Sequence, residues 1–238
     1  MTEIKKRSLL SKILLFAGIL GLPAFFIFIL TLGKQRFESL KYYGDHKIIT
    51  KTIDGKTVND TILYKVPAFE FTDHTGKLIT EKDFENKILI VNYIYADCPS
   101  DFCPIDFQNF KMFVADEIDK NDGFNDVAII SLFVGKKKDT LVEMNNFIEY
   151  FEINPKTWHL VQGDMAQFYN TDMLTQNPWT AKDSIFGLDR IAYNMTLLID
   201  RDLHIRGKYI TSQTSENKRI TKEISVLLRE EKDKLDEK

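Results

Sequence analysis

The sequence predicts an α/β protein: a mixed sheet flanked by helices, preceded by one N-terminal transmembrane helix. Residues 13–33 are a run of 21 uncharged residues rich in Ile, Leu and Phe. Beyond this run, short apolar segments of strand character alternate with segments whose apolar residues recur at helical spacing. With 238 residues, 44% of them apolar and 12% aromatic, the chain is long enough to bury one core after its N-terminal part is set aside.

The apolar run matches the ~20 residues that a helix needs to cross a hydrocarbon core of ~30 Å. Pro23 is compatible with a membrane helix, because neighbouring groups or local adjustment can satisfy the freed carbonyl. A cleaved signal peptide is the alternative, but its apolar region usually has ~7–15 residues and ends in small residues. Only Thr31-Leu32-Gly33 offers a weak site of that kind. We therefore expect a transmembrane anchor at residues 13–33.

The charges around this segment indicate its orientation. Residues 1–12 contain three lysines and one arginine, and the positive-inside bias therefore predicts a cytoplasmic N-terminal arm, although basic residues after the span reduce the asymmetry. The rest of the chain is then extracytoplasmic (periplasmic). Residues 34–64 form a polar juxtamembrane connector, in which Ile48–Ile53 followed by Asp54-Gly55 predicts a small hairpin. Residues 65–238 form the predicted domain.

The domain begins with a predicted hairpin. Pro67–Phe71 alternates between apolar and polar residues as a strand does, Thr75-Gly76 predicts a turn, and Leu78-Ile79 predicts the returning strand. Thr80, with Asp83 three residues later, has the pattern of an N-terminal cap on a short helical turn.

Three stronger signals follow. Ile88–Tyr95 is an almost continuous apolar run with many β-branched and aromatic residues, which predicts a central strand covered on both faces. Apolar residues at helical spacing predict a helix over Pro104–Ile118 with one buried stripe. Val127–Val134 is the next predicted buried strand.

The remaining pattern completes the sheet. A helix is predicted over residues 141–151 and a short strand at Trp158–Val161. Tyr193–Ile199 and His204–Ile210 predict an antiparallel hairpin, and Ile220–Leu228 a closing helix. Right-handed crossovers would make the first part of the sheet parallel, and the hairpin would add antiparallel edges, with helices on both faces. This is the thioredoxin-like arrangement.

The charge pattern argues against one class of partner. The net charge is −3, with acidic and basic residues interspersed. Nucleic-acid-binding proteins instead gather basic residues on one face. We expect no nucleic-acid partner.

The chain has two cysteines, Cys98 and Cys103, and both fall between the end of a central strand and the start of the next helix. Open α/β sheets place their sites there. Pro104 suits the first helical position, which would put Cys103 at the helix N-cap. The helix dipole would then favour its thiolate, whereas nearby carboxylates oppose ionisation. These carboxylates are Asp97, Asp101 and Asp106.

Two cysteines allow one intramolecular disulfide. In an oxidising compartment, Cys98 and Cys103 can pair, but a disulfide that closes so short a loop contributes only ~2 kcal/mol in the chain-entropy model. A purely structural disulfide between these cysteines would therefore stabilise the fold only a little. The location of the cysteine pair favours redox chemistry or a soft metal ion.

Four segments together resemble the SCO/SenC family of thioredoxin-fold proteins. They are Val91–Asp106, Asp139-Thr140, Trp158–Asp164 and Leu197–Tyr209, within a resemblance that covers roughly residues 65–230. The resemblance implies copper bound by a Cys-Pro-x-x-Cys-Pro loop and a distal histidine. It also implies a role in assembling the dinuclear copper centre of cytochrome c oxidase, by metal delivery, thiol reduction or both.

Residue by residue, Cys98 and Cys103 correspond to the family's two cysteines, and Pro99 and Pro104 to the prolines that follow them. The sequence departs from the family pattern at two places. Four residues separate the cysteines where the family has three. The histidine is expected at Ala192, or at Arg190 if Asp189 matches the acid that often precedes it, and neither position holds a histidine.

The four histidines of the chain lie elsewhere. His159 is the remaining candidate to replace the missing ligand. The other three, His46, His74 and His204, are expected to be solvated or structural residues. Cu(I) is well suited to soft thiolates and can be held by two sulfurs alone, whereas Cu(II) would bind poorly without an imidazole.

The sequence thus supports a membrane-anchored protein that binds Cu(I) through Cys98 and Cys103. Its expected partner is the copper-bearing subunit of cytochrome c oxidase, or another copper or thiol protein. One alternative is a thiol–disulfide oxidoreductase that uses the same two cysteines. Against it, the strand beginning near Tyr193 lacks the preceding proline that ordinary thioredoxins place opposite their cysteines. The other alternative is a degenerate family member that acts only as an interaction partner.

Overall fold

The computed structural model describes residues 19, 21, 23–27, 39–44, 46–53, 56–95, 103–134, 140–163 and 195–236. The chain divides into two units, residues 1–38 and 39–238. In the first unit the described residues are helical, and most of the predicted arm and span lies outside the described residues. No helix within the described ranges is both long and apolar enough to cross a membrane.

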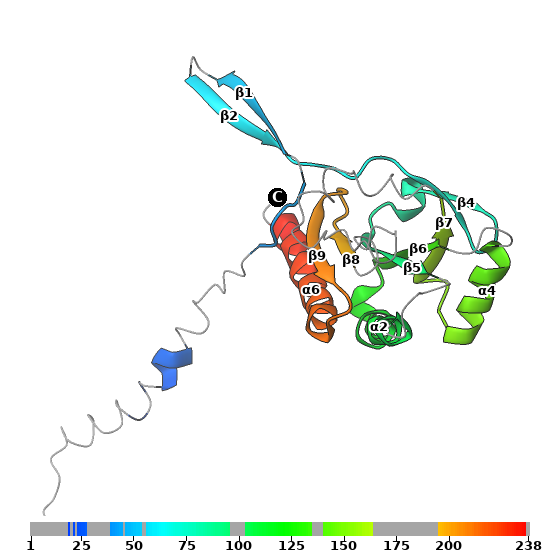
Figure 1. The fold of residues 1–238 in the computed structure, drawn as a ribbon. Helices are drawn as coiled ribbons and strands as arrows, with labels where there is room; N and C mark the ends of the chain where they lie inside the picture. The colour runs from blue at the N-terminus through cyan, green and yellow to red at the C-terminus, as the bar shows by residue number, and fades with distance from the viewer. Residues whose placement is uncertain are drawn as a thin grey trace, which may run out of the picture. The chain divides into compact units, whose positions relative to one another are not determined.

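The second unit contains one seven-stranded sheet in the order β4-β3-β7-β6-β5-β8-β9 (Figure 1). The neighbours β5, β6 and β7 are parallel, and every other pair in the sheet is antiparallel. The strands are β3 (Glu70–Asp73), β4 (Leu78–Thr80), β5 (Ile88–Tyr95), β6 (Val127–Val134), β7 (Trp158–Gln162), β8 (Met195–Ile199) and β9 (Ile205–Ile210). The predicted mixed α/β sheet of thioredoxin-like order is therefore confirmed.

The segments β1 (Lys47–Ile53) and β2 (Lys56–Ile62) form a separate antiparallel hairpin, as predicted for the connector. Strand β3 begins at Glu70 and not at Pro67 as predicted. Proline cannot donate a hydrogen bond to a ladder, and the backbone N–H of Val66 bonds instead to the carbonyl of Leu203 at 2.9 Å.

One long helical segment follows β5. It consists of α2 (Cys103–Phe110), a π-helical segment η2 (Lys111–Ala115) and α3 (Asp116–Lys120). The remaining elements are η1 (Glu81–Phe84), η3 (Asp122–Phe124), α4 (Thr140–Phe151) and α6 (Thr214–Asp236). At η1, Thr80 and Asp83 form the predicted reciprocal capping box.

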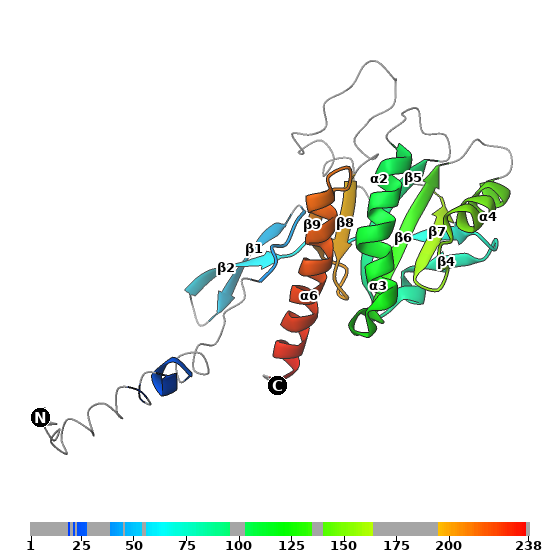
Figure 2. The same cartoon turned by 90° about the horizontal axis from the view of Figure 1, so that it is seen from below.

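Within residues 39–238, the described α-helices α2, α3, α4 and α6 pack on one face of the sheet, as Figure 2 shows. Strands β5, β6 and β7 follow one another in a single direction across the sheet. Right-handed crossovers between them must therefore put α2–α3 and α4 on the same side. In the described part of the chain, only the 3-10 helix η1 lies on the opposite face, and an α-helix on that face stays a prediction. The opposite face is covered by η1 and by the extended segment before β3, through Val66, Phe69 and Phe84.

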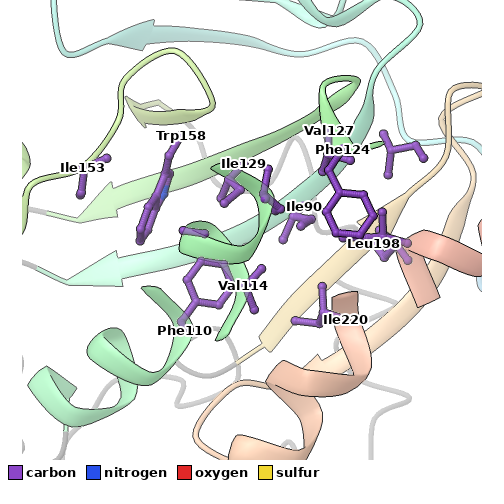
Figure 3. Packing of buried hydrophobic residues seen from close by; sticks show 14 of the residues in the cluster. Ile90, Phe110, Val114, Phe124, Val127, Ile129, Ile153, Trp158, Leu198 and Ile220 are labelled. Carbon is purple, nitrogen blue, oxygen red and sulfur yellow. The ribbon is translucent and has the colours of Figure 1, made fainter. Parts of the chain in front are cut away.

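The helix-facing core is continuous from α4 to α6. Ile90, Ile129 and Leu198 of the sheet and Val114 and Ile220 of the helices are completely buried in it (Figure 3). Apolar burial on this scale is the main stabilising contribution to a domain of this size.

A buried ionic network joins the start of this unit to its last helix. Arg206 of β9, whose side chain is 2% exposed, donates to Asp200 at 3.1 Å and to Glu230 of α6 at 2.6 Å. It also donates to the carbonyl of Leu40 at 2.9 Å and lies over the ring of Tyr42. Burial lowers the pKa of Arg206, but hydrogen bonds and charges from Glu230 and Asp200 outweigh this effect and raise it. The guanidinium is therefore held charged between its partners.

We predict that Arg206→Met lowers the free energy of unfolding by about 3–5 kcal/mol, because it leaves two buried carboxylates without their cation. Urea unfolding at neutral pH measures this loss. The matched control is Arg219→Met, since Arg219 is 43% exposed and pairs with Glu216 and Glu223. It should cost about 1 kcal/mol or less, and equal losses for the two variants would contradict the buried network.

Candidate functional site

The candidate site follows β5, a deeply buried strand of the sheet. The first four residues of β5, Ile88–Val91, are completely buried, and the strand ends at Tyr95. Helix α2 then begins at Cys103, one position before the start predicted from Pro104 and within the usual tolerance of helix boundaries. The predicted strand end and helix start on either side of the cysteine loop are confirmed. Cys98 and the other residues between 96 and 102 lie outside the described residues, and the pairing of the two sulfurs stays a prediction.

A chain of buried polar groups runs beneath the start of α2, across three neighbouring strands. The indole N–H of Trp158 on β7 donates to the hydroxyl of Ser131 on β6 at 2.7 Å. That hydroxyl in turn donates to the side-chain oxygen of Asn92 on β5. All three residues are buried, so each bond satisfies a group that would otherwise be costly to bury.

Trp158 also packs against the first two turns of α2. Phe107 stacks on its ring with centroids 5.3 Å apart. Phe110, which is labelled with Trp158 in Figure 3, meets the ring edge-on at 5.4 Å. Phe147 and Phe151 of α4 pack against Phe107 from the other direction, at 4.8 and 4.4 Å. The aromatic contacts fix the helix that begins at Cys103 against β7 and α4.

This support was not found from the sequence. The available signal was the presence of Asn92 and Ser131 within strands that are otherwise apolar. Buried polar residues of this kind need partners, but their common partner, Trp158, is distant in the chain and becomes a neighbour only through the parallel pairing of β5, β6 and β7.

Asp106, in the first turn of α2, is half-buried. Burial raises the pKa of its carboxyl above the ordinary value. A carboxyl whose pKa is higher in the folded chain opposes folding while it is ionised, and this cost disappears as pH falls through the raised pKa. When charged, Asp106 also opposes the ionisation of a thiol at the same helix end, against the effect of the helix dipole.

His159 lies in a different part of the domain. The register pairs it with Ile130, which in turn pairs with Val91. His159 therefore lies level with Val91, which is four positions before the end of β5. This places it about 13 Å from that strand end, measured along the strand. Its ring meets Phe84 edge-on at 5.1 Å, on the face opposite the helices, and lines a pocket of about 320 Å³. Burial lowers the pKa of this imidazole.

The structure thus does not bring His159 to the strand end at which the candidate site begins. Two other histidines have the structural roles expected of them. His204 bonds through Nδ1 to the carbonyl of Tyr64 at 2.7 Å, and His46 accepts from the backbone N–H of Tyr64 at 3.1 Å. Ala192 and Arg190 lie outside the described residues. Within those that are described, no three His, Cys, Asp or Glu residues are arranged to hold a metal ion.

We predict that Asp106→Asn lowers the pKa of the Cys103 thiol, because it removes a carboxylate from the same turn of the helix. Alkylation at pH 7 should become roughly two- to threefold faster in a Cys98→Ser background, in which Cys103 is the only thiol. The pH dependence of alkylation by iodoacetamide, followed by mass spectrometry, measures this change. Glu117→Gln, an exposed change further along the same helical segment, should leave the rate unchanged. A slower reaction in Asp106→Asn would contradict the electrostatic account.

Comparison with known proteins identifies proteins that are similar to this chain. The human protein named "Protein SCO1 homolog, mitochondrial" is 30% identical over 88 residues, which are 37% of this chain and 28% of that protein. Among solved structures, Arabidopsis thaliana ScoI with copper bound is similar at 17% identity and a TM-score of 0.46, over 68% of this chain and 99% of that one. BsSco, described as a member of the Sco family of cytochrome c oxidase assembly proteins, is similar at 18% identity and a TM-score of 0.49, over 68% of this chain and 93% of that one.

The SCO1/SenC family profile matches residues 62–225. The match begins at the end of β2, includes the whole seven-stranded sheet and both cysteines, and ends within α6. It spans well over half of the sequence, and the chain therefore belongs to the SCO1/SenC family.

Proposed function

We propose that this chain binds Cu(I) through the thiolates of Cys98 and Cys103 and assists the assembly of a copper centre, that of cytochrome c oxidase being the expected one. The observation that carries the proposal is the place of the chain's two cysteines. They occur where β5 ends and α2 begins, in a chain of the SCO1/SenC family. The copper ion is the cargo of such a protein and not a resident cofactor.

The donor chemistry of the two residues fits Cu(I). Thiolates are soft ligands, and Cu(I) accepts low coordination numbers, whereas Cu(II) prefers nitrogen and oxygen in tetragonal geometry. Binding by two thiols releases two protons and leaves a net charge of −1 on the bis-thiolate site. The N-terminal end of α2 favours such a negative charge. With Ala and Arg at the two positions where the family's histidine could fall, two-sulfur coordination is the form that this sequence supports.

We predict that the reduced chain binds one Cu(I) and that either Cys98→Ser or Cys103→Ser abolishes its retention, because one thiolate is left where two are needed. Competition with a chromophoric Cu(I) chelator measures this affinity. His159→Ala is the matched control, since its ring lies on the face of the sheet opposite α2, and it should leave Cu(I) affinity unchanged.

The converse experiment restores the missing ligand. Ala192→His, or Arg190→His for the other alignment, should add Cu(II) binding detectable by electron paramagnetic resonance, because imidazole is a suitable Cu(II) ligand. If the unsubstituted chain retains no Cu(I) against a modest competitor and neither histidine adds copper binding, the copper proposal is wrong. Reversible cycling of the two cysteines between dithiol and disulfide would then support the oxidoreductase alternative.

We also propose that residues 13–33 anchor the chain in a membrane, with residues 1–12 in the cytoplasm and the domain on the extracytoplasmic side. The composition of the segment and the basic residues before it support this topology. We predict activity for a reporter that works only outside the cytoplasm when it is fused after Lys238. The basic N-terminal arm stays in the cytoplasm, so a single span places the C-terminus on the other side. Activity of a cytoplasm-specific reporter at the same position would contradict this orientation.

A further inference from the structure

The hairpin of β1 and β2 has two faces of different chemistry. These strands pair with each other and with no other described strand. Because directly paired residues share a face and successive residues alternate, the register assigns each side chain. One face, which we call the basic face, carries Lys47, Ile49, Lys51, Val58, Asp60 and Ile62. The other carries Ile48, Thr50, Thr57, Asn59 and Thr61.

The basic face combines exposed aliphatic groups with ammonium groups. Val58 is 45% exposed and Ile62 is 50% exposed, and they pair with Lys51 and Lys47 of β1. Lys51 bonds to Asp60 across the strands at 2.6 Å. The opposite face has hydroxyl and amide groups, with Thr50 donating to Asn59 at 3.3 Å, and no charged residue among those assigned to it.

The domain holds this hairpin at its base. An isolated two-stranded hairpin is marginally stable in water, but here one end is attached to β9 and the other to the turn between β8 and β9. Before β1, the N–H of Tyr43 bonds to the carbonyl of Ile205 at 2.9 Å; after β2, that of Val66 bonds to the carbonyl of Leu203 at 2.9 Å. The hairpin therefore presents its basic face from a fixed base.

The distribution of charge indicates which surface would bind there. Residues 34–65 contain seven basic and four acidic residues, for a net charge of +3, whereas residues 66–238 contain 21 basic and 30 acidic residues, for a net charge of −9. An anionic surface would attract the connector and repel the rest. Lysines beside aliphatic side chains are typical of segments that bind at the headgroup boundary of an anionic bilayer.

We propose that the basic face of the β1–β2 hairpin binds the surface of an anionic lipid bilayer. The apolar run of residues 13–33 ends fourteen positions before Lys47, so a bilayer crossed by that run is within reach of the hairpin. This inference rests on the proposed anchor for its choice of partner. It makes no use of copper or of the cysteines.

The test uses the full chain reconstituted into vesicles that contain brominated lipids, which quench tryptophan fluorescence. Val58→Trp places a reporter on the basic face, and Ile48→Trp is the matched control on the other face, where Ile48 is 73% exposed. The unsubstituted chain, with its two tryptophans, supplies the background. In phosphatidylglycerol vesicles, emission from position 58 should fall by roughly half, while position 48 changes little, because only the first ring lies at the headgroup boundary.

Two further arms test the electrostatic part. Neutral phosphatidylcholine vesicles should largely abolish the quenching at position 58. Lys47→Gln should weaken association of the hairpin with anionic vesicles roughly fivefold, whereas Lys82→Gln, an exposed change in η1, should have no effect.

Absence of quenching at position 58 in anionic vesicles, or equal quenching at both positions, would overturn the proposal. The proposal would also be wrong if the environment of the tryptophan at position 58 changed only in dimers of the chain, detected by cross-linking. The basic face would then bind a second copy of the chain. The hairpin variants retain Cys98 and Cys103. Their Cu(I) affinity therefore reports on the proposed function separately from lipid binding.

Discussion

The parallel pairing of β5, β6 and β7, with each strand following the previous one in the same direction across the sheet, organises this domain. A right-handed crossover from each strand to the next leaves one side of the sheet for the connecting helices. The same geometry makes β5 a fully covered central strand and directs the chain from its end into the start of α2. The position of the candidate site follows from this arrangement before any side chain of the site is considered.

The attachment of the connector and the start of the cysteine loop lie at opposite ends of the sheet. Strands β5 and β9 both run antiparallel to β8 and are therefore parallel to each other. The start of β9, where Tyr43 and Arg206 attach the connector, lies at the end where β5 begins. The cysteines follow the other end of β5. Its eight residues span about 25 Å, so the surfaces proposed for lipid binding and for copper binding are different ones.

Many elements were predictable because their signal is local. The limits of β5 and β6 agree with the apolar runs to the residue, since strands covered on both faces are continuous in hydrophobicity. The cap at Thr80 and the hairpin of the connector also depend on neighbouring residues. The Arg206 network was not predictable in this way. It joins Leu40 and Glu230, which are 190 positions apart, and a charged residue in an edge strand does not indicate which carboxylates it will meet.

For the candidate site, the sequence by itself determined the residue types and their place in the order of elements: two cysteines after a buried strand and before a helix, and no histidine where the family has one. Only the tertiary structure decided that Trp158, Ser131 and Asn92 support α2, and that His159 faces a separate pocket. The physical reason is that strand periodicity sets which side of its own strand a residue occupies. Which elements cover that side, and how far the residue lies from the strand end, depend on the pairing of distant segments.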